Sequence, residues 1–222
     1  VGVELWAYSL NNNTVWLVAD INNGTDSSMV LNRMMVNVGN TIYFNADDGN
    51  SGTELWGFNL SNFTTWLVAD INPGSWSSII SNNNAVIIDS TVMFTAWDGD
   101  PNAAGYALWA HDDESQMTWK VHGTLAVVEM LPVVNETLYF SASLTSGTQL
   151  WAYDVSNNSV WFIKYFGSGS AGNWLAQSMA ILVDDTIYFD ADDGTSGSEL
   201  WAHNTSNGST WLVHDINSGQ ND

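Results

Sequence analysis

The segment Glu54-Leu-Trp-Gly-Phe-Asn-Leu-Ser-Asn-Phe-Thr-Thr-Trp-Leu-Val-Ala-Asp70 holds two tryptophans ten residues apart, each inside a run of strand-forming residues. Apolar runs on both sides of an Asn- and Ser-rich centre are typical of a β-hairpin. The same Leu-Trp, with a second Trp ten residues later, recurs in the pairs Trp6/Trp16, Trp56/Trp66, Trp109/Trp119, Trp151/Trp161 and Trp201/Trp211. A constant offset in every copy predicts one hairpin of fixed length, repeated along the chain.

Two further apolar runs precede four of these hairpins. In one repeat, strands are expected at Met34–Val38, Thr41–Asn45, Glu54–Phe58 and Thr65–Asp70. Four short antiparallel strands per repeat form the blade of a β-propeller. The first repeat offers only the hairpin, with strands expected at Glu4–Ser9 and Thr14–Asp20.

We therefore predict an all-β chain, a β-propeller of about five blades, with four complete four-stranded blades after an N-terminal half-blade. A linear β-solenoid is the alternative. The expected domain is a single one over residues 1–222, with the half-blade at 1–27 and blades at 28–76, 77–124, 125–172 and 173–222. Because an open strand edge invites pairing, we expect missing sequence before Val1 or a neighbouring chain to complete the half-blade, unless it stays open. Self-association, or contact with neighbouring chains of a surface assembly, is the partner that this predicts.

The charge of the chain excludes whole classes of function. There are 24 acidic against three basic residues, for a net charge of −21. Binding to nucleic acid needs Lys and Arg to neutralise phosphates, so we expect none. No apolar run is long enough for a membrane-spanning helix, and we expect no membrane insertion. The acidity keeps molecules apart, or alternatively adapts the chain to salt or divalent cations outside the cell.

Several segments resemble the ELWxxDGT-type repeats of large surface and secreted proteins of bacteria and archaea. They are Gly52-Thr-Glu-Leu-Trp56, Trp66-Leu-Val-Ala-Asp-Ile-Asn-Pro-Gly74, Tyr188-Phe-Asp-Ala-Asp-Asp-Gly194 and Gly197-Ser-Glu-Leu-Trp201. The resemblance implies a propeller-like β module in an extracellular array or adhesin. Two repeats depart from it, because Tyr106-Ala-Leu-Trp109 and Thr148-Gln-Leu-Trp151 lack the Glu.

Asn-x-Ser/Thr sequons, the acceptors of N-linked glycans, recur at one place in the repeat. Asn12, Asn62, Asn157 and Asn207 each lie six residues after the first Trp of a pair, in the expected hairpin turn. Further sequons begin at Asn23, Asn59, Asn135 and Asn204. We predict covalent N-glycans on these turns, which requires secretion. The alternative is that Asn is frequent there because it tolerates left-handed backbone conformations.

Acidic turns follow the second strand of two repeats, in Asn45-Ala-Asp-Asp-Gly49 and Asp190-Ala-Asp-Asp-Gly194. Alternating oxygen ligands around a Gly resemble a Ca²⁺ loop, so candidate ligands are Asp47, Asp48, Asp190, Asp192 and Asp193. The alternative is a plain Asp-Gly turn. No other cofactor is expected.

The tryptophans outside the pairs are candidates for stacking on a sugar, namely Trp76, Trp97 and Trp174. We expect the paired tryptophans to pack in the core. Glu4, Glu54 and Glu199 share one repeat position, which favours a structural role for them.

No motif for a nucleophile, a phosphate-binding loop or paired His metal ligands occurs, and we expect no enzyme activity. The sequence therefore predicts a non-catalytic extracellular structural or adhesive module, N-glycosylated and part of a larger surface assembly or filament. The alternative function is a carbohydrate-binding, lectin-like propeller.

Overall fold

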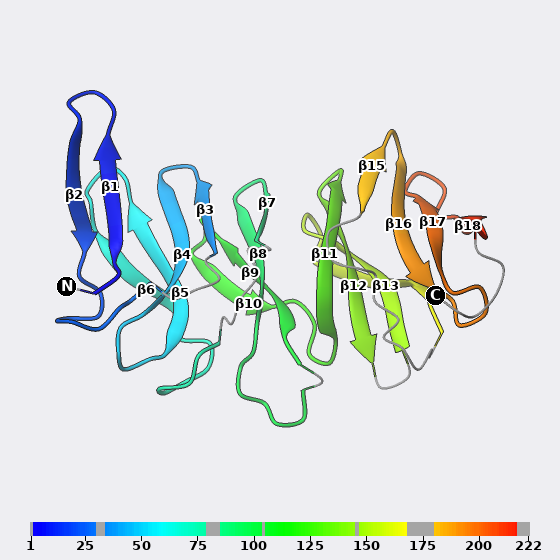
Figure 1. Cartoon of the computed structure of the whole chain (residues 1–222), viewed down its shortest axis with the longest axis horizontal. Coiled ribbons are helices and arrows are strands. Elements are labelled where there is room, and N and C mark those ends of the chain that lie inside the picture. The colour runs from blue at the N-terminus through cyan, green and yellow to red at the C-terminus, as the bar shows by residue number, and fades with distance from the viewer. Residues whose placement is uncertain are drawn as a thin grey trace. The chain divides into compact units, whose positions relative to one another are not determined.

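A computed structural model describes residues 2–29, 34–78, 85–103, 105–144, 147–167 and 180–216. Every regular element in these ranges is a β-strand, and they hold no helix. The strands form one two-stranded sheet and four four-stranded sheets, each antiparallel and each meandering in chain order (Figure 1). The chain divides into two compact units, Val1–Asn102 with Trp109–Lys120, and Ala103–Leu108 with Val121–Asp222.

The first three sheets come from the N-terminal half of the chain. The two-stranded sheet consists of β1 (Leu5–Ser9) and β2 (Thr14–Ala19). The next sheet consists of β3 (Met35–Val38), β4 (Thr41–Asp47), β5 (Thr53–Asn59) and β6 (Thr65–Ala69). The third consists of β7 (Val86–Ile88), β8 (Thr91–Ala96), β9 (Ala107–Asp112) and β10 (Met117–Lys120).

The last two sheets belong to the second unit. One consists of β11 (Ala126–Val134), β12 (Thr137–Leu144), β13 (Gly147–Asp154) and β14 (Ser159–Tyr165). The other consists of β15 (Ile181–Val183), β16 (Thr186–Asp192), β17 (Ser198–Asn204) and β18 (Thr210–His214). The expected all-β chain, with one two-stranded repeat followed by four-stranded ones, is thus confirmed for the described residues.

Apolar side chains on facing sheets form the core within each unit. In the first unit, Leu55 of β5 and Tyr43 of β4 are fully buried against Val92 and Phe94 of β8. In the second unit, Leu150, Phe166, Ile187, Phe189 and Trp201 form the equivalent cluster. Burial of the inward-facing side chain at every second strand position is the main stabilising contribution of such sheets.

The paired tryptophans lie on the hairpins, and only some of them pack in the core as expected. Trp56 and Trp109 are half-buried against core clusters. Trp201 is buried, but Trp6 is 50% exposed and Trp211 is 41% exposed. In four of the five hairpins the strand register shifts between the Leu and the Trp of Leu-Trp. The second Trp of each pair instead packs across the hairpin on a small residue, and the cross-strand partners are Ala7, Gly57, Ala110, Ala152 and Ala202.

Candidate functional site

The turn of each Trp hairpin has one geometry, which is clearest between β5 and β6. The side-chain oxygen of Asn59 accepts hydrogen bonds from the backbone N–H of Ser61 (2.8 Å) and of Asn62 (3.2 Å). Phe63 N then donates to the carbonyl of Asn59 (2.9 Å), with Phe63 at a φ of 58°. The equivalent turn positions also have positive φ, at Asn13, Gln116, Asn158 and Gly208.

Four sequons place their Asn at the same position of these turns. In each, the Asn side-chain oxygen accepts from both the backbone N–H and the hydroxyl of the Ser or Thr two residues later. The hydroxyl distances are 2.8 Å for Asn12, 2.7 Å for Asn62 and 2.6 Å for Asn207, and Asn157 makes the same bond to Ser159. All four Asn side chains are exposed. The nitrogen that a glycan would modify makes no hydrogen bond to described residues at Asn12, Asn62 and Asn207, whereas that of Asn157 donates to Asp154 (2.8 Å).

The other sequons differ from these in geometry. Asn59 and Asn204 begin hairpin turns, and their side-chain oxygens hold the turn; Asn204 also donates to Thr186 (3.2 Å). Asn23 is exposed in the segment after β2, and Asn135 is exposed at the β11–β12 turn with a φ of 47°. The structure therefore separates four equivalent, exposed acceptors from four others.

The acidic turns use their carboxylates to hold the backbone. Asp48 Oδ1 accepts from the N–H groups of Asn50 (2.9 Å) and Ser51 (2.7 Å), and Asp193 Oδ1 accepts from Thr195 and Ser196. Partial burial raises the pKa of Asp48, but the hydrogen bonds from Ser51 and Asn50 outweigh it and leave the pKa below its usual value. Asp47 and Asp192 accept from Gly49 and Gly194 in the same way, both at 2.7 Å.

These turns do not fit a Ca²⁺ loop in their present geometry. A protein Ca²⁺ site supplies several oxygen ligands from one loop, out of six to eight in total. Among the described residues, no three acidic or His side chains lie close enough together to hold a metal ion. Asp190 is on β16, opposite Leu200, and not in the turn. Ca²⁺ binding at these aspartates stays a prediction.

The three unpaired tryptophans have different surroundings. Trp76 lies between β6 and β7 and is 71% exposed. Trp97 is half-buried, and its backbone N–H donates to the carbonyl of Ser78 (2.9 Å). Trp174 lies outside the described residues. Of the two that are described, Trp76 is therefore the one that offers an open ring face.

A buried glutamate links the end of one sheet to the start of the next. Glu54, at the start of β5 and fully buried, accepts hydrogen bonds from Ile71 N (2.9 Å), Ser78 N (3.1 Å) and Ser78 Oγ (2.5 Å). The carbonyl of Ser78 accepts from Trp97 N at the end of β8, so this serine joins both sheets. Burial raises the pKa of Glu54 to about 7, against the lowering effect of the hydrogen bond from Ser78.

The same link occurs one repeat earlier. Glu4 accepts from Ile21 N, Ser28 N and Ser28 Oγ, and the carbonyl of Ser28 accepts from Asp47 N (2.9 Å). Glu199 accepts from Ile216 N (2.9 Å). The expected structural role of the shared Glu is thus visible in its contacts.

A buried polar cluster between β4 and β9 has no obvious sequence signal. The hydroxyl of Tyr43 donates to Asp113 Oδ1 (2.5 Å), and His111 Nε2 lies 3.1 Å from the same hydroxyl oxygen. Because the tyrosine proton goes to Asp113, the hydroxyl accepts from His111 Nε2–H, and His111 Nδ1 accepts from Thr118 Oγ (2.8 Å). Burial lowers the pKa of His111 and raises that of Tyr43.

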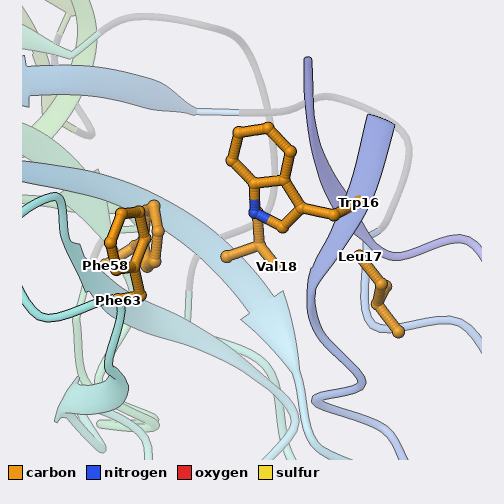
Figure 2. A pocket seen from close by; sticks show the side chains of 5 residues that line it. All are labelled: Trp16, Leu17, Val18, Phe58 and Phe63. Carbon is orange, nitrogen blue, oxygen red and sulfur yellow. The ribbon is translucent and has the colours of Figure 1, made fainter. Parts of the chain in front are cut away.

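The structure also has an aromatic groove that the sequence pattern does not predict. Trp16, Leu17 and Val18 of β2 line one part of it, and Phe58 and Phe63 line another, around a volume of about 370 Å³ (Figure 2). The rings of Phe58 and Phe63 lie side by side, with centroids 6.3 Å apart, on the side of the groove away from Trp16. The signal that could have found it is Phe63, which stands where other hairpins have Asn, Gln or Gly.

No family model matches the chain, and no curated protein does so either. Solved structures do match at low identity. TolB from Acinetobacter baumannii is similar over 93% of this chain and 47% of its own, at 12% identity and a TM-score of 0.50. A Mycobacterium tuberculosis puromycin-hydrolyzing peptidase is similar over 93% of this chain and 31% of its own, at 8% identity and a TM-score of 0.55.

An oligogalacturonate lyase in complex with manganese is similar over 96% of this chain and 59% of its own, at 12% identity and a TM-score of 0.51. The chain thus spans less than two thirds of each of these proteins. At such identity the likeness shows the fold alone, which is an all-β, propeller-like arrangement of antiparallel sheets.

The expectation that the chain has no enzyme activity is wrong, because missing motifs do not exclude catalysis for this fold. We based it on missing motifs, but proteins of this fold include a puromycin-hydrolyzing peptidase and a lyase. Function resides in sites carried by a fold, so this fold is compatible with catalysis. No helix among the described residues is long and apolar enough to cross a membrane.

Proposed function

We propose that the chain is a repeat module of an extracellular surface assembly, with N-linked glycans on its Trp hairpins. The observation that carries the proposal is the common geometry of four sequons at one repeat position, namely Asn12, Asn62, Asn157 and Asn207. Random sequons in an Asn-rich chain would fall at unrelated positions. These four are exposed and share one turn, in which the Ser or Thr hydroxyl is already bound to the Asn side chain.

Further features support the same proposal. The resemblance to ELWxxDGT-type repeats favours a surface array, and the net charge of −21 suits a module that stays hydrated at high local concentration. We include in the proposal that the sheets are blades of a propeller of about five blades. Neighbouring chains of the assembly, or further copies of this one, are its partners.

Glycosylation can be tested on protein secreted from a eukaryotic host, by mass spectrometry of its peptides before and after enzymatic release of N-glycans. We expect occupancy at the four exposed hairpin sequons and little at Asn59 and Asn204, whose side chains are half-buried. Bare peptide at all four hairpins, with a normal glycan on a co-secreted control protein, would contradict the proposal. Sparse occupancy spread evenly over all eight sequons would remove its structural basis.

Carbohydrate binding is the second candidate function, and Trp76 favours it. Its ring is 71% exposed. Its backbone passes so close to Gly52 that a Cβ atom at position 52 would lie 2.6 Å from the carbonyl carbon of Trp76. The exposed ring is therefore available for stacking on a sugar. A glycan array probed with the wild type and with Trp76→Ala tests this candidate. We expect hits that the substitution abolishes, and an array without hits rejects it.

A further inference from the structure

The groove between Trp16 and Phe63 has an unusual residue in its wall. Phe63 occupies the turn position with a φ of 58°, where an aromatic side chain meets a steric cost that Gly or Asn largely avoids. Burial does not offset this cost, since Phe63 is 62% exposed. Residues held in sparsely populated backbone conformations cluster at binding sites.

Comparison of the hairpins shows that two residues differ together here. In the first and fourth hairpins, a Tyr hydroxyl donates to the Asn at the positive-φ position, Tyr8 to Asn13 (2.7 Å) and Tyr153 to Asn158 (2.8 Å). In the second hairpin, Phe58 and Phe63 replace that pair, and a ring contact replaces the hydrogen bond. The hydrogen bond that holds the turn in the other two hairpins is thus replaced here by an aromatic surface that faces Trp16 (Figure 2).

The position of this surface indicates its occupant. Asn62, the sequon residue next to Phe63, is exposed and leaves its amide nitrogen without a hydrogen bond to described residues. A second sequon, at Asn12, lies in the hairpin that carries Trp16. Aromatic ring faces attract the C–H-rich faces of sugar rings, and a sugar attached to Asn62, the residue next to Phe63, would meet such a face without any loss of translational freedom.

We propose that the groove of Trp16, Phe58 and Phe63 is the binding site for the first sugars of an N-glycan on Asn62. This inference rests on the proposed function, because it requires that Asn62 carry a glycan. The glycan covers the exposed Phe63 ring and fixes the second hairpin against β2. The hairpin of Asn157 lacks this binding site, because Asn158 stands at the position equivalent to Phe63.

The test uses secreted glycoprotein in which Asn→Gln substitutions leave one hairpin sequon, at Asn62 or, as matched control, at Asn157. NMR of the glycan should show upfield ring-current shifts of the first sugars at Asn62 and none at Asn157. Phe63→Gln keeps the sequon and introduces the residue that Gln116 represents in the third hairpin. It should abolish the shifts without reducing occupancy.

A second readout is the melting temperature before and after enzymatic glycan release. Release should lower it in the Asn62 protein, but neither in its Phe63→Gln variant nor in the Asn157 protein. An occupied Asn62 with unshifted sugar signals would overturn the inference and leave the proposed function standing. An empty Asn62 beside an occupied Asn157 would do the same. Absence of glycan at both sites would overturn the two together.

Discussion

At the scale of single residues, the hydroxyl of Tyr43 should contribute to stability, and Tyr139 provides the comparison. Its hydroxyl serves Asp113 and His111 at once, and both Tyr43 and His111 are almost fully buried. Tyr43→Phe leaves the Nε2–H of His111 without an acceptor, and an unsatisfied buried donor costs about 1–3 kcal/mol. We expect a loss of that size in the free energy of unfolding, measured by urea denaturation.

Tyr139→Phe is the matched control for that prediction. Tyr139 contacts His203 ring to ring, with centroids 5.4 Å apart, as Tyr43 contacts His111. Among the described residues, however, its hydroxyl makes no hydrogen bond, and His203 is instead paired with Thr210 (2.8 Å). The control should therefore be nearly neutral. Equal losses in the two variants would show that the hydroxyl network contributes nothing specific.

Glu54 gives stability a predictable dependence on pH. Because burial raises its folded-state pKa to about 7, above the ordinary value of 4.5, the folded protein keeps a proton that the unfolded chain releases. Its contribution to stability is complete below pH 4.5 and is lost as the pH rises through 7. We expect this to amount to about 1–3 kcal/mol between about pH 5 and pH 8.

Glu54→Gln isolates that effect from other titrations, including the opposite one of His111, whose lowered pKa makes folding less favourable in acid. Denaturation midpoints of the wild type and the variant, taken from about pH 5 to pH 8, should diverge in slope. The glutamine side chain cannot ionise, so the variant should lack the alkaline decline. Parallel curves would mean that Glu54 does not titrate in this range.

At the scale of elements, Ser78 should matter more than its place in a loop suggests. It is fully buried, donates to Glu54 and accepts from Trp97, so it fastens the segment after β6 to two sheets. Ser78→Ala removes the hydroxyl bond to a carboxyl group and should cost about 1–3 kcal/mol. Ser75→Ala, on the exposed part of the same segment, is the control and should cost almost nothing. Similar denaturation midpoints for both variants would contradict this role.

The strands were predictable because the constant ten-residue spacing of the paired tryptophans indicates the length of each hairpin. Expected strands at Thr41–Asn45 and Thr65–Asp70 agree with β4 (Thr41–Asp47) and β6 (Thr65–Ala69) to within two residues. Alternation predicted that Leu55 faces the core, but it could not predict the register shift between Leu55 and Trp56. Such bulges leave no periodic signal.

The candidate sites were predictable only in part, for a related reason. Sequon spacing within a rigid hairpin located Asn62 correctly on an exposed turn. The groove beside it joins β2 to the β5–β6 hairpin, and the Tyr43 cluster joins β4 to β9. Contacts of that kind depend on how sheets pack, and a repeat pattern carries no information about which side chains of successive repeats meet.

At the scale of the whole molecule, the charge dominates the response to salt. A chain with a net charge of −21 repels itself when folded, and at physiological ionic strength salt screens the repulsion between charges that lie more than about 8–10 Å apart. The melting temperature should therefore rise with NaCl. One ion pair, Lys120 with Asp98 at 2.8 Å, is present among the described residues, so little attraction is lost in exchange.

The same measurement separates screening from specific Ca²⁺ binding at the acidic turns. The oxygens of Asp48 and Asp193 already accept backbone N–H groups, and ligation of Ca²⁺ would have to compete with these bonds. We therefore expect CaCl₂ and MgCl₂ at equal ionic strength to raise the melting temperature alike. An extra rise with Ca²⁺ alone, lost in Asp48→Asn and Asp193→Asn but kept in Asp26→Asn, would instead establish a Ca²⁺ site at these turns. The outcome decides whether the repeated Asp-Asp-Gly is a ligand set or a device that closes the β4–β5 and β16–β17 turns.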